Sequence, residues 1–375
     1  MSHNLVWTRA RIAAVALATA SIQLLSIAPA GGAELEQPPK LVGIASQAFA
    51  AHATTYAAEI GIPPAFLQLF WTLESSGSTW LGELEITEDY GAQPYIEITT
   101  TDLDGLVDGS LDANVNSVIT TVKNWLSQSP GRRVLLAPLP EANLVDFPWG
   151  ADPAGYKAGY IRIRQAFRDA GVGPDQARFV FAMHGTSSAG LSMADFYPGD
   201  TVVDIVGFSI INRNHPWHDY DSAFQRFLDE IKGTISQPKP ILITQTASVV
   251  EGQDRAGWLD DMFTNLGNDS QVIGIIYFNR DKFEGGKFND YRVIKEDGWI
   301  DPAFKQGAID WSSPGGVEWL FNGEMDAWVA NREEVFAGAP YFTDIGSSPF
   351  EIDILWLAGE GITQGCNPPV NDRFC

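Results

Sequence analysis

Cysteine is nearly absent from this chain of 375 residues, and histidine is scarce. The two cysteines, Cys366 and Cys375, lie at the extreme C-terminus, so the main body has no thiol for catalysis. In an oxidising compartment they can pair, and we expect a disulfide between them. The histidine pair His215 and His218 has no third ligand at metal spacing, so we expect neither a metal site nor another cofactor.

Basic residues are also few. Lysine and arginine total 24 against 47 aspartates and glutamates, which gives a formal net charge of −23. Nucleic acids and anionic membranes are both bound through basic patches. The composition therefore argues against nucleic acid as a partner. The acidic residues are scattered, which is typical of a solvated surface.

Long apolar runs are absent after the N-terminal segment. Arg9 and Arg11 precede an apolar stretch over 12–27, and small residues follow it. This pattern predicts a secretory signal peptide over 1–33 and therefore a secreted, extracellular protein. A single membrane anchor is the alternative, but the apolar stretch is short and interrupted by polar residues. We expect no membrane span after cleavage.

From residue 41 to about 280, short apolar runs alternate with amphipathic helical patterns. We expect strands over 41–45, 66–71, 94–98, 134–137, 179–182, 203–208, 241–244 and 272–277. Strands that alternate with helices pair in parallel through right-handed crossovers. The sequence therefore predicts an α/β fold, a (β/α)₈ TIM barrel over 38–335. An open doubly wound sheet is the alternative, but no Gly-x-Gly-x-x-Gly turn follows the first run.

Glu141 follows the apolar run 134–137, with Asn143 and Trp149 close behind it. Residues just beyond the carboxyl ends of barrel strands form the functional sites of this fold. A carboxylate there, beside an amide and an indole, is typical of the general acid of a sugar-cleaving enzyme. A surface glutamate is the alternative interpretation.

Four short motifs occur in order along the barrel region: Pro140-Glu141-Ala142-Asn143 with Pro148-Trp149, Tyr197-Pro198-Gly199-Asp200, Lys239-Pro240-Ile241, and Tyr277-Phe278-Asn279. With them, the segment from about 41 to 295 resembles glycoside hydrolase family 26, whose members are mainly β-mannanases on a (β/α)₈ barrel. The resemblance implies that Glu141 is the acid/base and that the partner is mannan or a related β-linked polysaccharide.

The sequence differs from that family at positions that take part in catalysis. The family's nucleophile position matches Gln245, and the tyrosine that would hold the nucleophile matches Ile211. Pro140 replaces a motif histidine, and His184 stands where the family has asparagine. A retaining glycosidase needs two carboxyls about 5 Å apart, and an amide is a poor nucleophile. Glu74, Glu97 and Asp102 are candidate replacements, although each is interpreted more simply as a solvated or structural acid.

Aromatic rings and amides complete the expected site, because rings stack on the apolar faces of sugars. The residues expected to bind substrate are Trp71, Asn143, Trp149, His184, Asn212 and Trp217. Trp80 also lies on the strand-end side, whereas Trp125 and Trp258 fall in helical stripes and are expected in the core. Two hypotheses follow: a glycosidase that uses an unrecognised second carboxylate, and a degenerate relative that binds glycan without cleaving it.

The last segment, 341–375, resembles the first half of a bacterial S-layer-homology repeat. Such repeats continue into a second helix, but this chain stops at Cys375. The resemblance implies an exported bacterial protein more than an attached one, with cell-wall contact through the repeat as the alternative to a freely secreted protein.

Overall fold

The computed structural model describes residues 38–185, 190–213, 217–235, 237–250, 254–284 and 286–330. The expected signal peptide over 1–33, the S-layer-like segment over 341–375 and both cysteines lie outside these residues.

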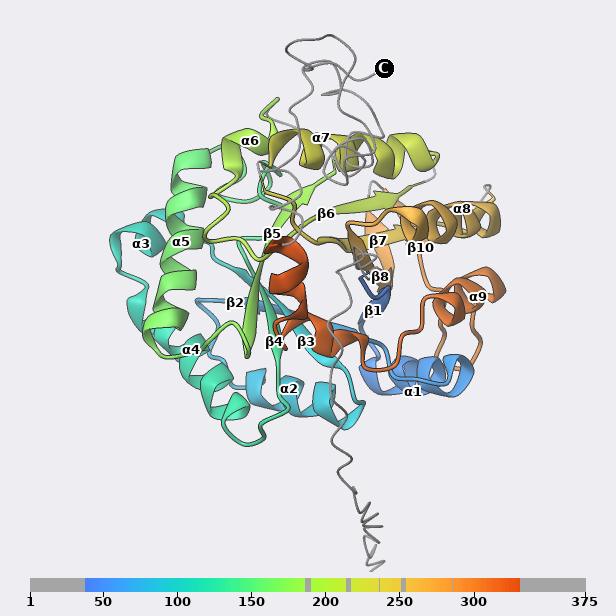
Figure 1. Cartoon of the computed structure of the whole chain (residues 1–375), viewed down its shortest axis with the longest axis horizontal. Coiled ribbons are helices and arrows are strands. Elements are labelled where there is room, and N and C mark those ends of the chain that lie inside the picture. The colour runs from blue at the N-terminus through green and yellow to red at the C-terminus, as the bar shows by residue number, and fades with distance from the viewer. Residues whose placement is uncertain are drawn as a thin grey trace, which may run out of the picture. The chain divides into compact units, whose positions relative to one another are not determined.

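Eight parallel strands close into one barrel in chain order, with β8 pairing back onto β1 (Figure 1). Their bounds are β1 Leu41–Ser46, β2 Phe66–Thr72, β3 Gln93–Thr99, β4 Val134–Pro138, β5 Ala177–His184, β6 Ile205–Asn212, β7 Ile241–Ser248 and β8 Val272–Asn279. The (β/α)₈ prediction is confirmed, and the open sheet is excluded.

The strands are apolar because both faces of each strand are covered. Every residue of β1, β4 and β8 is buried, as expected for parallel strands between a packed interior and a layer of helices. β5, β6 and β7 run beyond their apolar stretches to His184, Asn212 and Ser248. Polar side chains on these extensions therefore lie at the carboxyl end of the barrel.

Helices surround the barrel (Figure 1). They are α1 Phe49–Ile60, α2 Trp80–Asp89, α3 Leu103–Asp108, α4 Asp112–Leu126, α5 Pro153–Asp169, α6 Met193–Phe196, α7 Arg226–Thr234, α8 Arg255–Asn268 and α9 Pro302–Asp310. The apolar stripes predicted for α4 and α8 are buried, and they include Trp125 and Trp258, as expected. A π-helical turn over Asp221–Gln225 precedes α7.

Aspartates start four of these helices. Asp102, Asp152 and Asp254 each accept a hydrogen bond from the N–H of a glycine three residues later, whereas Asp301 caps α9 by accepting from the N–H groups of Ala303 and Phe304. A Cβ on any of these three glycines would lie only 2.3–2.5 Å from the capping carboxylate. The Asp-x-x-Gly pattern therefore fixes where each helix leaves its βα loop.

Residues 316–330 pack against the amino end of the barrel. The 3₁₀ helix η2, Gly316–Leu320, leads into a helical turn over 324–330, drawn in orange-red across the barrel in Figure 1. Arg178, in the second position of β5, donates to the carbonyl of Leu320 and forms a bidentate pair with Asp326. This contact closes the end of the barrel opposite the carboxyl ends of the strands.

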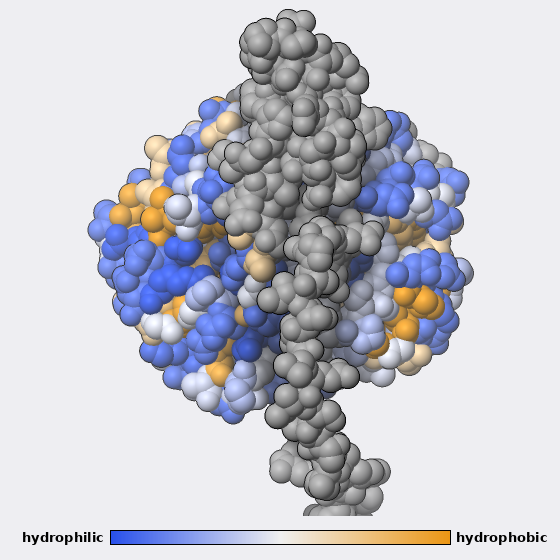
Figure 2. All heavy atoms as spheres, viewed as in Figure 1, coloured by the Kyte–Doolittle hydropathy of each residue, from blue (hydrophilic) through white to orange (hydrophobic). Residues whose placement is uncertain are grey.

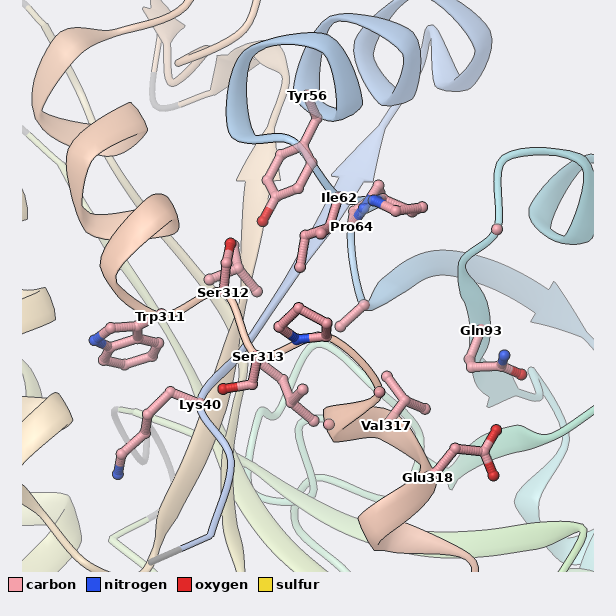
Figure 3. A pocket seen from close by; sticks show the side chains of 18 residues that line it. Lys40, Tyr56, Ile62, Pro64, Gln93, Trp311, Ser312, Ser313, Val317 and Glu318 are labelled. Atoms are coloured by element: carbon pink, nitrogen blue, oxygen red, sulfur yellow. The ribbon is translucent and has the colours of Figure 1, made fainter. Parts of the chain in front are cut away.

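A cavity of about 310 Å³ opens beside this closure, at the amino ends of β1 to β3. Figure 3 shows Tyr56, Trp311 and Glu318 among the residues around it. Lys40 also lines the cavity, but its ammonium donates to the carbonyls of Asp269 and Val272. Burial lowers the pKa of Lys40 to about 8. This face of a barrel generally contributes stability rather than catalysis.

The coloured surface in Figure 2 is mainly hydrophilic, with apolar residues in separate groups. Within the described ranges, every helix is too short or too polar to cross a bilayer.

Candidate functional site

Glu141 lies at the carboxyl end of the barrel, three residues after β4. Its side chain is 22% exposed. The hydroxyl of Ser209 on β6 donates a hydrogen bond of 2.6 Å to its Oε1, and Nε2 of His184 on β5 lies 4.0 Å from the same oxygen. The carboxylate is therefore held among the ends of β4, β5 and β6, which we call the mouth.

Gln245 reaches the mouth through a bulge in β7. The β6–β7 register pairs Phe208 with Ile243 but Ser209 with Gln245, so Thr244 is an extra residue. Residues paired across neighbouring strands share a face of the sheet. Gln245, which is partly exposed, therefore points to the same side as Ser209. Ser209 thus has the Glu141 carboxylate on one side and the Gln245 amide on the other.

Glu97 is a second carboxyl group inside the barrel. It lies on β3, next to Ala137 of β4 in the register, and is 7% exposed. Burial raises the pKa of Glu97 well above its ordinary value, and the charge of Glu141 raises it further, while the Gln68 amide opposes both effects. The surroundings of Glu97 therefore favour its protonated form, and its carboxyl is close enough to Glu141 to sense that charge.

Glu74 and Asp102 have structural roles. The Glu74 carboxylate accepts hydrogen bonds from the backbone N–H and hydroxyl of Thr101 and from the hydroxyl of Thr100. Burial alone would raise the pKa of Glu74, but these bonds lower it. Asp102 caps α3. The structural interpretation of these two acids is confirmed.

Two of the tryptophans expected to stack on sugar are buried, so that prediction is wrong for both. Trp149 has no exposed surface; its indole stacks on Phe147 and donates to the carbonyl of Pro140. Trp71 stacks on Trp80 of α2 and donates to Glu83. Both rings pack on the helical layer or under a loop, where a glycan has no access. Trp217 is partly buried against the core.

Phe70 is the aromatic residue that the sequence reasoning missed. It lies one position before Trp71 on β2, pairs with Glu97 in the register, and is 44% exposed. Because side chains alternate along a strand, Phe70 faces into the barrel and Trp71 faces the helices. The guanidinium of Arg280, which follows β8, lies 5.5 Å from the centre of the Phe70 ring. Side chains of β2 and β3 that are paired in the register point to the same side. Because Glu97 points into the barrel, this pairing would have predicted that Phe70 also points into the barrel.

The two asparagines expected to bind substrate are instead bound to backbone. The Asn143 amide donates to the carbonyl of His184 and accepts from its N–H, with distances of 3.0 and 2.7 Å. Asn212 makes the same pair of bonds with His218. Both asparagines are buried. They position loops around the mouth, and the prediction that they bind sugar directly is wrong.

The described residues contain no cluster of three or more histidine, cysteine, aspartate or glutamate side chains suited to a metal. His215 lies outside them. The arrangement at the mouth consists of one partly exposed carboxylate, a hydroxyl, an imidazole, an amide and an exposed ring. Such groups hydrogen-bond to and stack on sugars.

No family model matches the chain. Endoglucanase H of Acetivibrio thermocellus is 25% identical over 196 residues, which are 48% of this chain and 21% of that protein. This chain therefore matches about a fifth of the length of its curated relative.

The barrel is found in many solved structures, among them the following three. A Cellulomonas fimi endo-β-1,4-mannanase double mutant superposes with a TM-score of 0.55 at 15% identity, over 74% of this chain and 73% of that chain. A GH26 β-mannanase from Bacteroides ovatus gives 0.51 at 13% identity, over 74% and 90%. GH26C from a Muricauda species gives 0.52 at 14%, over 74% and 86%. The chain therefore has a glycoside-hydrolase-like fold, shared with GH26 β-mannanases.

Proposed function

We propose that this protein binds a β-linked polysaccharide, mannan or a related glycan, at the mouth of its barrel and hydrolyses it little or not at all. The observation that carries the proposal is the placement of Ser209 between the carboxylate of Glu141 and the amide of Gln245. The shared fold with mannanases and the match to an endoglucanase support the class of ligand.

The expected lack of hydrolysis follows from the amide of Gln245. A retaining mechanism needs one neutral carboxyl to protonate the leaving oxygen and one ionised carboxyl, about 5 Å away, to attack the anomeric carbon. Gln245 has nearly the shape of glutamate but carries no charge. It can donate to and accept from sugar hydroxyls, so it retains a binding role while the nucleophile is missing.

The test is to measure binding and cleavage in parallel. Wild-type protein is titrated with a soluble mannan and a soluble β-glucan, and reducing ends are counted over the same samples. We expect saturable binding without turnover. Glu141→Gln is the control, because it removes charge and preserves shape. Robust turnover that Glu141→Gln abolishes would refute the binding-only proposal.

Hydrolysis with Glu97 as the second carboxyl is the other candidate function. It is favoured by the position of Glu97 on β3, beside β4, where its carboxyl is coupled to that of Glu141, since pairs of interacting carboxyls are the usual acid/base arrangement. The burial of Glu97 argues against direct contact with a sugar. Turnover lost in both Glu97→Gln and Glu141→Gln, but retained in Gln245→Ala, would support this candidate.

Export and surface attachment also belong to the proposal. The basic and apolar residues of 1–33 support secretion, and N-terminal sequencing of protein from the culture medium tests it. The S-layer-like segment 341–375 supports contact with the cell wall. Sedimentation with purified cell walls, with and without that segment, tests the contact.

A further inference from the structure

A two-stranded hairpin leaves the barrel directly after β8. β9, Asp281–Glu284, pairs antiparallel with β10, Lys287–Asp290, which is labelled in Figure 1. Phe283 lies directly opposite Phe288 in this register, so the two side chains share one face. They are 71% and 60% exposed, more than any other large apolar side chain in the described part of the chain.

The opposite face of the hairpin is anchored to the barrel. Glu284 accepts hydrogen bonds from Arg213, which follows β6, and from the hydroxyl of Tyr291. Since β7 lies between β6 and β8, the Arg213–Glu284 pair joins strands on both sides of the strand that carries Gln245. The hairpin is therefore part of the rim of the mouth.

The base of the hairpin is fixed as well. Arg292 forms ion pairs with Asp290 and Asp281, at 2.9 and 3.3 Å. Asn289 is buried. An isolated two-stranded hairpin is only marginally stable in water. These polar contacts hold it in place while leaving its aromatic face in solvent, so the phenylalanines are not needed as core for the hairpin itself.

The size and surroundings of the pair indicate its ligand. A stable protein interface buries about 800 Å² on each partner, far more than two phenylalanines present. One or two sugar rings need no larger platform, because aromatic rings stack on their apolar faces.

We propose that Phe283 and Phe288 form a second glycan contact, which holds a polysaccharide chain where it leaves the mouth. The inference rests on the proposed function, because the same polymer occupies both places. A ligand long enough to extend past the rim gains this contact, and a short oligosaccharide confined to the mouth does not. The pair therefore gives the protein a preference for long chains.

The experiment compares ligand lengths. Affinities for a polymeric mannan or β-glucan and for the corresponding short oligosaccharide are measured by calorimetry. The proteins are the wild type, Phe283→Ala/Phe288→Ala, and Phe283→Tyr/Phe288→Tyr, which keeps the rings. Leu81→Ala/Ile161→Ala is the matched control, because it removes two exposed apolar side chains from the outer helices α2 and α5.

We expect the alanine pair to weaken polymer binding by about tenfold and to leave oligosaccharide binding unchanged, while the tyrosine pair and the control behave as wild type. Unchanged polymer affinity in the alanine pair would overturn the inference. Equal losses for long and short ligands would also overturn it, because the pair would then belong to the mouth itself. A wild-type protein that binds none of the glycans would overturn the proposed function together with this inference.

Discussion

The hydroxyl of Ser209 donates a hydrogen bond of 2.6 Å to the carboxylate of Glu141. The donor comes from β6 and the acceptor from the loop after β4, so the bond joins two sides of the mouth. The bond fixes the carboxylate beside β6, which pairs with β7. The residue at position 245 therefore decides whether Glu141 has a carboxylate on β7 as a partner in addition to the buried Glu97.

Gln245→Glu should restore a second carboxylate but only partial hydrolysis. Ile211 still stands where the family that the barrel region resembles has a tyrosine, and groups that act as a unit in catalysis are strongly non-additive. We expect turnover to appear above the wild-type level and to vanish in Gln245→Glu/Glu141→Gln. Reducing-end release from soluble mannan measures it, with Gln245→Ala as the control that removes the amide without adding charge.

Trp149→Ala should lower the free energy of unfolding by about 3–5 kcal/mol, because it removes a fully buried ring. Trp149→Phe keeps the stacking on Phe147 but leaves the carbonyl of Pro140 without its donor, so we expect a loss of about 1–3 kcal/mol. Urea unfolding followed by fluorescence measures both. Wild-type stability in Trp149→Ala would contradict the burial described above.

The strands could be predicted because short apolar runs between turn residues are typical of buried parallel strands. Their carboxyl ends could not. β6 and β7 continue through Ser209 and Gln245 to Asn212 and Ser248, and polar residues interrupt the apolar pattern. The polar residues that line the mouth thus interrupt the apolar pattern from which the strands are predicted. The carboxyl ends of these strands therefore cannot be recognised from that pattern.

The position of Glu141 could be predicted from its place after β4, but the direction of the aromatic side chains could not. Trp71 and Phe70 are adjacent, and only the phase of the strand decides which of them faces the mouth. The β9–β10 hairpin was also missed, although two glycines between aromatic residues are a recognisable turn signal. Bulges such as the one at Thr244 change which side chains of a strand point into the barrel, and the sequence gives no clear signal of them.

Asn143→Asp should destabilise the protein more at pH 7 than at pH 4. The substituted side chain keeps the acceptor for the His184 N–H but loses the donor to its carbonyl. Burial opposite a carbonyl should raise the pKa of the introduced carboxyl above its unfolded value, so the stability retained at low pH is lost as the pH rises. Chemical unfolding at both pH values measures the effect. Asn143→Ala, which cannot ionise, should show the same loss at each pH.

Glu97 should make the wild type lose stability between weakly acidic and neutral pH. Its folded pKa is raised above the ordinary value of 4.5, so the unfolded chain ionises first. While only the unfolded form is ionised, each pH unit removes up to about 1.4 kcal/mol. Glu97→Gln has no ionisable group at this position, so it lacks this pH-dependent loss of stability. Unfolding curves for both proteins from pH 4.5 to 7.5 should therefore show the variant gaining stability relative to the wild type, and parallel curves would contradict the raised pKa.

Leu139 and Glu141 adopt left-handed backbone conformations, with φ angles of 52° and 54°. Such conformations cost roughly 1–3 kcal/mol each in residues other than glycine. Here they are held by the complete burial of Leu139 and by the bond from the Ala142 N–H to the carbonyl of Ala182. The loop is therefore preorganised: the carboxylate already points into the mouth before any ligand arrives, and binding need not order it. Substitutions that keep the backbone, such as Glu141→Gln, consequently report on charge alone, whereas Glu141→Gly would relieve the strain and report on loop order.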